Sequence, residues 1–238
     1  MRLSPGMRHN QLVKENKQPQ QQAAVVINTD SLHLKLVEFE QDCKTLKSFE
    51  SIADRVEHKR NVLIPKYQPL VEAYLEQGES YQNPIFTDMI VWQFDIEQLD
   101  TAVAWCMKAI EMEAPLPEGW KRKSWNCVCA DFVLEWAEAQ AEKKQSVEPY
   151  FSTVFEKIRS EWRLHEEINA KWFKFAGLQL LRDEEGNAVA SSVGDVETLN
   201  KARELLEAAQ EFNPKVGVKT LISKINQRVR ALTEGTNL

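Results

Sequence analysis

Three acidic residues in the segment TDMIVWQFDIEQLD could supply the carboxylates of a metal-dependent nuclease. Such an enzyme needs two or three carboxylates that converge on Mg²⁺, and Asp88, Asp95 and Asp100 are the nearest candidates. On a helix, Asp88 and Asp95 would lie about 10 Å apart along the axis, too far to ligate one ion without another segment. Acids at such positions also stabilise the start of a following helix through its dipole. We therefore expect no metal site and interpret these acids as caps or solvent-facing groups, with Asp88 and Asp95 kept as catalytic candidates.

Other catalytic signatures are absent from the sequence. None of the eight glycines lies in a G-x-x-x-x-G-K-[ST] phosphate loop, whose backbone N–H groups and lysine would hold a nucleotide. The four histidines are scattered, and the only close cysteine pair is C-x-C, not the C-x-x-C spacing of zinc sites. We expect reduced thiols, no bound metal and no cofactor on this chain.

Basic residues gather in two places where they could meet phosphates. The densest run is KRK, and a second group surrounds the sequence RVEHKR. The formal net charge of −6 argues against one large positive face but not against local patches. Basic side chains beside helix ends often only contact water, and this alternative stays open. The candidate phosphate contacts are Arg55, Lys59, Arg60, Lys66, Lys121, Arg122 and Lys123.

The composition predicts an all-α protein. With 43% hydrophobic residues, 8 Gly and 9 Pro, the chain can bury a core but has few residues for the tight turns of a sandwich or barrel. The sequence contains no run of about 18 apolar residues, so it predicts no membrane span, and the N-terminus does not resemble a signal peptide.

The first predicted helix is long and resembles a coiled coil. It should run from residue 31 to about residue 60, with apolar residues at alternating spacings of four and three. Such a seam can drive self-association, although an amphipathic helix that packs on its own domain has the same pattern. The candidate oligomerisation residues are Leu32, Leu36, Phe39 and Leu46.

Antiparallel helical hairpins should follow. Pro65 is expected to break the first helix, and Gly78 and Asn83-Pro84 are typical end and start signals. KWFKFAGLQLLR and KARELLEAAQEFNP have the small and aromatic residues of a tetratricopeptide-like hairpin. A long polar loop, DEEGNAVASSVGD, should join its two helices and be mobile. The predicted helices cover 67–77, 84–96, 97–113, 124–143, 147–164, 167–182, 196–212 and a last segment to about 232.

Several segments together resemble one family. They are LIPKYQPLVEAYLEQG, NPIFTDMIVWQFDIEQLDTAVAWCMKAIE, PLPEGWKRK, CADFVLEWAE and GDVETLNKARELLEAAQEFNPKVGVKTLI. This combination resembles the small terminase subunits of peduovirus-like temperate tailed phages, traditionally named terminase endonuclease subunits. The resemblance covers roughly residues 31 to 225. Family members end in a long Lys/Arg-rich tail, whereas this chain ends ALTEGTNL, so its C-terminus is not expected to grip DNA.

The resemblance implies a role in viral DNA packaging. The expected partners are double-stranded phage DNA at its cohesive-end region, a large ATPase and nuclease subunit, and further copies of this chain, for example in a ring. Mg²⁺ and ATP are expected on the large subunit, and the location is the bacterial host cytoplasm. Two alternatives stay open: a tetratricopeptide-like protein scaffold without DNA contact, and a metal-dependent endonuclease in its own right.

These expectations divide the chain into four segments. Residues 1–30 would be a disordered, basic, Gln-rich arm, and 31–80 a long helix plus hairpin that could mediate oligomerisation and DNA binding. Residues 81–165 would form a central helical domain, and 166–238 a tetratricopeptide-like hairpin with a final helix.

Overall fold

The protein is built from helices. Its structure, a computed structural model, describes residues 29–78 and 81–236, so the predicted N-terminal arm lies outside the described residues. Within these two ranges the only β-type pairing is an isolated bridge between Arg182 and Ala188. The all-α prediction is therefore confirmed. No helix in the described part of the chain is both long and apolar enough to span a membrane.

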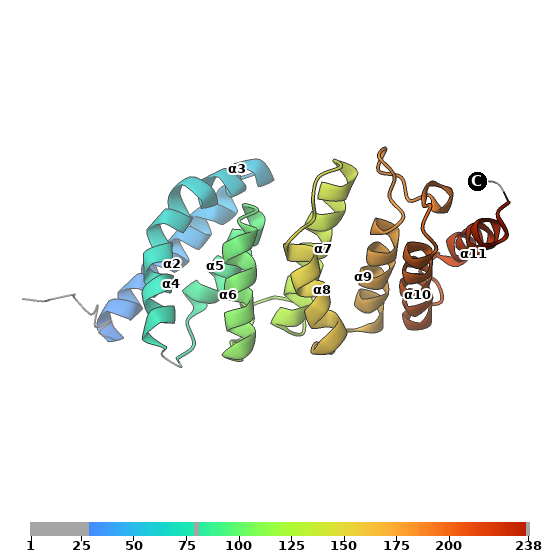
Figure 1. Cartoon of the computed structure of the whole chain (residues 1–238). Coiled ribbons are helices and arrows are strands. Elements are labelled where there is room, and N and C mark those ends of the chain that lie inside the picture. Colours follow the sequence, from blue (N-terminus) through green and yellow to red (C-terminus); the bar gives the residue numbers. More distant parts are fainter. Residues whose placement is uncertain (1–28, 79–80, 237–238) are drawn as a thin grey trace, which may run out of the picture.

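The helices form one row in chain order, from α2 and α4 at one end to α11 at the other (Figure 1). Each helix packs mainly on its neighbours in sequence, and α9 and α10 form the most extensive pair. The elements are α2 (Thr29–Ser48), α3 (Ile52–His58), the π-helical η1 (Lys59–Leu63), α4 (Ile64–Gln77), α5 (Pro84–Asp95), α6 (Leu99–Glu111), α7 (Trp125–Glu142), α8 (Tyr150–Ser160), α9 (Glu166–Gln179), the 3₁₀ turn η2 (Ala190–Ser192), α10 (Val196–Phe212) and α11 (Lys219–Glu234).

The long first helix was predicted wrongly at both of its supposed breaks. It ends at Ser48, and a new helix begins after Ser51, whose hydroxyl accepts a hydrogen bond from the Asp54 N–H. Conversely, Pro65 does not interrupt the chain, which stays helical from Ile52 to Gln77. The π turn explains this, because its wider backbone loop relieves the crowding that a proline ring imposes on an α-helix.

The predicted start and end signals work as expected elsewhere. The Asn83 side-chain oxygen accepts from the N–H groups of Ile85 and Phe86 at 3.1 and 3.4 Å, and Gly78 ends α4 with a φ of 62°. Ser124 and Asp195 cap α7 and α10 in the same way. Local sequence therefore determines where these helices begin and end.

One large core holds α2 to α9 together, and a smaller one holds the C-terminal end. Phe39 of α2 stacks on Trp92 of α5 at 5.2 Å and meets the Tyr67 ring edge-on at 5.0 Å. Helix α5 is buried on most of its circumference, since eight of its twelve residues are buried: Ile85, Phe86, Thr87, Met89, Ile90, Trp92, Gln93 and Phe94. The smaller core is formed by Leu181, Ala190, Leu199, Ala202, Leu206, Val218 and Ile225.

The predicted hairpin of α9 and α10 exists and is very close-packed. Gly177 permits the approach, because a Cβ there would lie 2.8 Å from Cγ of Leu206. The tetratricopeptide-like interpretation stays a prediction. The mobility of the connecting loop stays a prediction, but the loop folds back on the chain just after the end of α9. The Val189 N–H donates to the Leu181 oxygen at 2.9 Å, and Ala190 is buried.

Candidate functional site

In the folded chain, Arg55, Lys59 and Arg60 of the first basic group each contact a different partner. Arg55 donates from Nε and Nη2 to the Phe49 carbonyl oxygen, at 2.9 and 2.6 Å, across the break between α2 and α3. Lys59 is bound by the Asp95 carboxylate, and its side chain is only 13% exposed. Arg60 is exposed and donates to the Ile96 carbonyl oxygen at 3.3 Å. Most of these cations therefore have structural partners.

Lys66 is engaged on the side of α4 that faces α2. Its Nζ lies 2.6 Å from Asp42 Oδ2 and 2.8 Å from Glu38 Oε1. Hydrogen bonds from Lys66 and then Lys35 lower the pKa of Glu38 to about 2, so the acid stays ionised opposite the lysine. Since Tyr67 also donates its hydroxyl to Asp42 at 2.7 Å, Lys66 belongs to a polar network that holds α4 on α2.

The run Lys121, Arg122 and Lys123, called the basic loop from here on, stays exposed between α6 and α7. Lys121 and Lys123 form no ion pair with any described residue. Arg122 Nε lies 2.8 Å from Asp131 Oδ2, yet its side chain remains 55% exposed. This contact is an ion pair in distance, although its angles are not those of a hydrogen bond. The basic loop is thus the least neutralised of the predicted groups.

Asp131 also interacts electrostatically with a second cation, Lys171 of α9. Burial raises the pKa of Asp131, and the positive charges of Arg122 and Lys171 oppose that shift. Asp131 therefore lies within electrostatic range of both the basic loop and α9. Lys171 was not among the predicted site residues, and the only signal in the sequence is KWFK, where two lysines flank core aromatic residues.

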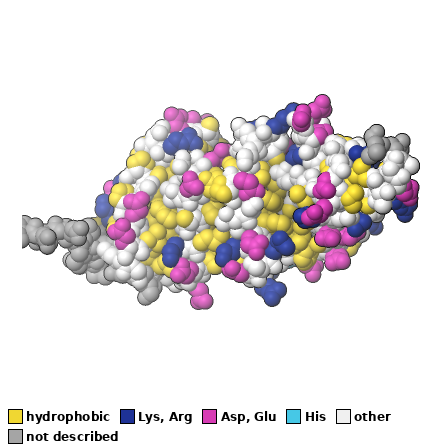
Figure 2. All heavy atoms as spheres, viewed as in Figure 1, with side chains coloured by type: hydrophobic (Ala, Val, Ile, Leu, Met, Phe, Trp, Pro, Cys, Tyr) yellow, Lys and Arg dark blue, Asp and Glu magenta, His cyan; other side chains and the backbone are white. Residues whose placement is uncertain are grey.

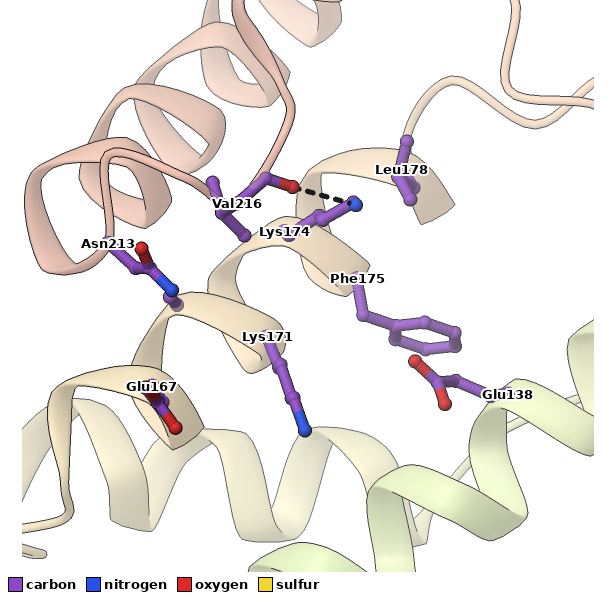
Figure 3. A pocket seen from close by; sticks show the side chains of 9 residues that line it. Glu138, Glu167, Lys171, Lys174, Phe175, Leu178, Asn213 and Val216 are labelled. Atoms are coloured by element: carbon purple, nitrogen blue, oxygen red, sulfur yellow. Dashed lines mark hydrogen bonds between the residues drawn. The ribbon is translucent and has the colours of Figure 1, made fainter.

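Lys171 also lines a cavity of about 400 Å³ among α7, α9 and the turn before α11. Figure 3 shows Lys174 pointing toward the Val216 carbonyl oxygen and Lys171 pointing in a different direction, and Glu138, Glu167 and Phe175 also line the cavity. Lys174 Nζ donates to the Val216 carbonyl oxygen at 2.9 Å and ties α9 to that turn. Two lysines and two glutamates leave this cavity without net charge.

On the face drawn in Figure 2, basic and acidic side chains alternate, with apolar side chains between them. This face carries no continuous positive surface. Any contact of the viewed face with a polyanion would therefore depend on a local group such as the basic loop, and not on the overall charge of the molecule.

The candidate catalytic acids do not converge. Asp95 is the last residue of α5 and is paired with Lys59, and Asp88 lies two turns earlier on the same helix. Burial raises the pKa of Asp88 to about 6 against the opposing charges of Lys47 and Lys59, so Asp88 is not the solvent-facing acid that we expected. In the ranges that the structure describes, no group of three or more His, Cys, Asp or Glu residues could hold a metal ion.

Comparison with known proteins identifies the family. The model of the phage small terminase subunit matches residues 36–167, more than half of the chain. The chain belongs to the phage small terminase subunit family. It is 37% identical over 214 residues to the probable terminase, endonuclease subunit of Haemophilus phage HP1, which covers 90% of this chain and 76% of that relative. It is 24% identical over 231 residues to the terminase, endonuclease subunit of Escherichia phage P2, which covers 97% of this chain and 87% of the relative. No solved structure matches.

Family membership confirms the resemblance drawn from the sequence and supports a role in phage DNA packaging. The matched region contains α3 to α8, so it includes both predicted basic groups and both candidate acids.

In this small terminase subunit, most residues of the predicted self-association seam of α2 pack against the core of their own chain. Phe39 and Leu46 are 4% and 8% exposed and belong to the large core, and Leu36 packs against it. Leu32 is half-buried. The alternative that α2 packs on its own domain therefore explains the seam. Self-association remains a prediction, and it would have to use a surface other than this seam.

Proposed function

We propose that this chain is the DNA-recognition and adaptor subunit of a phage packaging terminase. It binds the cohesive-end region of concatemeric viral DNA, self-associates, and directs a large ATPase and nuclease subunit to that region for cleavage and packaging. It acts in the cytoplasm of the bacterial host. Family membership supports the packaging role, and the finer assignments rest on the residues discussed below.

The exposed basic loop carries the DNA-binding proposal. It presents three consecutive cations, of which two form no ion pair with any described residue. Lys171 lies close enough to Asp131 to act on the same side. In contrast, Lys59 and Lys66 are held by acids of their own chain. Because phosphate binding by a paired lysine would first cost its ion pair, the basic loop is the better contact.

We assign DNA cleavage, and with it Mg²⁺ and ATP, to the large subunit. Two observations support this assignment. Asp95 is paired with Lys59, and Asp88 lies two turns away from Asp95 on the same helix. Both relatives are named as endonuclease subunits of a terminase, which makes cleavage by this chain the alternative to test. Purified chain that nicks cohesive-end DNA in Mg²⁺ on its own, and loses this activity in Asp88→Ala or Asp95→Ala, would contradict it.

The DNA contact can be tested by gel-shift titration of cohesive-end and scrambled duplexes at two salt concentrations. Replacing all three basic-loop residues with Ala should lower the affinity and reduce the slope of log K against log salt by about 2 to 3, since each phosphate contact contributes about 0.9. The matched control replaces Lys108, Lys157 and Lys201, each of which pairs with a glutamate three or four residues away in the chain.

The control removes the same formal charge, so only a local contact separates the two variants. An equal loss in both would show that net charge alone governs binding and would refute the basic-loop assignment. If neither duplex binds the wild-type chain at low salt, the DNA-recognition proposal itself fails.

A further inference from the structure

In the part of the chain that the structure describes, large exposed apolar side chains occur only near the two ends of the row of helices. In the described residues they are Leu34, Val37, Ile52 and Val62 at one end and Leu180 and Val189 toward the other. None of the described residues between 64 and 179 belongs to this set. In a row of stacked helices, each inner helix is covered on both sides, whereas the first and last are covered on one side only. The apolar exposure follows this geometry.

At the N-terminal end, helix α2 carries an apolar stripe that its own core does not cover. Leu34 and Val37 are 69% and 52% exposed and lie one turn apart on the side opposite Phe39 and Leu46. Glu40 continues the stripe by one more turn, is exposed, and forms no ion pair with any described residue. Leu34, Val37 and Glu40 are called the head stripe.

At the C-terminal end, a groove of about 450 Å³ lies between the η2 loop and α11. Its apolar lining includes Val189, Leu221 and Ala231, and Lys224 contributes a positive charge. Lys224 is exposed and takes part in no ion pair within the described ranges. This groove is called the tail groove. Figure 1 shows α11 at the opposite end of the row from α2.

We propose that copies of this chain associate end to end, with the head stripe of one copy seated in the tail groove of the next. Leu34 and Val37 supply apolar side chains for the apolar part of the groove, and the acid at Glu40 complements the cation at Lys224. The partner is a second copy because one chain carries both complementary surfaces, at opposite ends where they cannot meet within the chain. This inference rests on the self-association in the proposed function and names its surfaces.

The contact is heterologous, since it joins two different surfaces. Each added copy leaves one free head stripe and one free tail groove, so the assembly grows until it closes into a ring or continues as a filament. A symmetric dimer through α2 alone would not use the tail groove.

Light scattering on the full-length chain tests the contact. The head variant Leu34→Lys with Val37→Lys places two cations opposite Lys224, and the tail variant Val189→Lys with Ala231→Lys places two in the groove itself. Each variant alone should have the mass of a monomer, with unchanged far-UV circular dichroism. An equimolar mixture should form a dimer and nothing larger, because only one intact head and one intact groove remain per pair.

Ile52→Lys is the matched control, since Ile52 is 76% exposed but lies on α3. It should leave the wild-type mass unchanged, and a monomeric Ile52→Lys would move the contact from α2 to α3. A tail variant that keeps the wild-type mass, or a mixture that stays monomeric, would overturn the end-to-end contact.

Duplex binding separates this inference from the DNA-recognition proposal. Wild-type chain that binds duplex but is monomeric at all concentrations refutes self-association and leaves DNA recognition standing. Wild-type chain that assembles but binds no duplex refutes DNA recognition and leaves the end-to-end contact standing.

Discussion

Adding one methyl group at Gly177 should weaken the α9 and α10 hairpin measurably. A Cβ at this position would lie 2.8 and 2.9 Å from the Cγ and Cδ2 atoms of Leu206 and 3.1 Å from the Ala202 carbonyl oxygen. Real Cβ atoms essentially never approach closer than 3.0 Å. Leu206 is fully buried and the Ala202 atom belongs to the backbone, so neither neighbour can move away freely.

Two opposing effects set the magnitude for Gly177→Ala. Alanine favours a helix interior over glycine by about 1 kcal/mol, whereas overpacking a close-packed core costs about 1–3 kcal/mol. Because two contacts fall below the limit, we place the cost toward the upper part of that range. The free energy of unfolding should then fall by about 1–2 kcal/mol.

Urea denaturation followed by circular dichroism would measure this change as a lower midpoint at an unchanged slope. Gly194→Ala is the matched control, since a Cβ there meets nothing within 4 Å. It should be neutral or stabilising by up to about 1 kcal/mol. A Gly177→Ala chain as stable as the wild type would refute the argument that glycine is needed for this close approach.

Two further predictions concern residues that the sequence presented differently from the structure. Burial raises the pKa of Asp88 to about 6, above its usual 3.8. Ionised Asp88 therefore lowers the free energy of unfolding, fully so above about pH 6, and this loss of stability disappears as the pH falls toward 4. Asp88→Asn should therefore raise the free energy of unfolding by about 1–3 kcal/mol at pH 7 and by progressively less at lower pH, in denaturation curves at pH 7 and 5. An equal gain at both pH values would refute this. Leu46→Asp should lower the free energy of unfolding by roughly 3 kcal/mol or more, because Leu46 is buried in the core. The melting temperature measured by circular dichroism should fall accordingly. A Leu46→Asp chain that melts like wild type but loses only self-association would return the interface to the predicted seam.

Much of the fold could be predicted from short stretches of sequence. The caps at Asn83, Ser124 and Asp195 and the turn at Gly78 depend on residues within about four positions. The signals predicted at Gly78 and Asn83 were correct, and the helix starts predicted at residues 124 and 196 lie within one residue of those observed. The errors arose where the backbone had an uncommon alternative. Nothing in the sequence announced that a π turn would carry the helix past Pro65.

The candidate site was less predictable, because the partners of a charged side chain come from distant segments. Lys59 and Asp95 are 36 residues apart, and Lys66 and Asp42 are 24 apart. From sequence alone, the basic residues between 55 and 66 and those at 121 to 123 looked equally available. Only the packing of α4 on α2 and on α5 showed that the first group is largely neutralised, while the basic loop is not.

The sequence by itself determined that the chain is helical, where most helices start, and which family it belongs to. These properties follow from local hydrogen bonding and from residue patterns that a linear chain already contains. The tertiary structure decided which face of α2 the core uses, which cations stay exposed, and that Asp88 is half-buried and not solvent-facing. The physical reason is that burial and charge pairing depend on which helices become neighbours, and a helical pattern shows that a face is apolar without showing what will cover it.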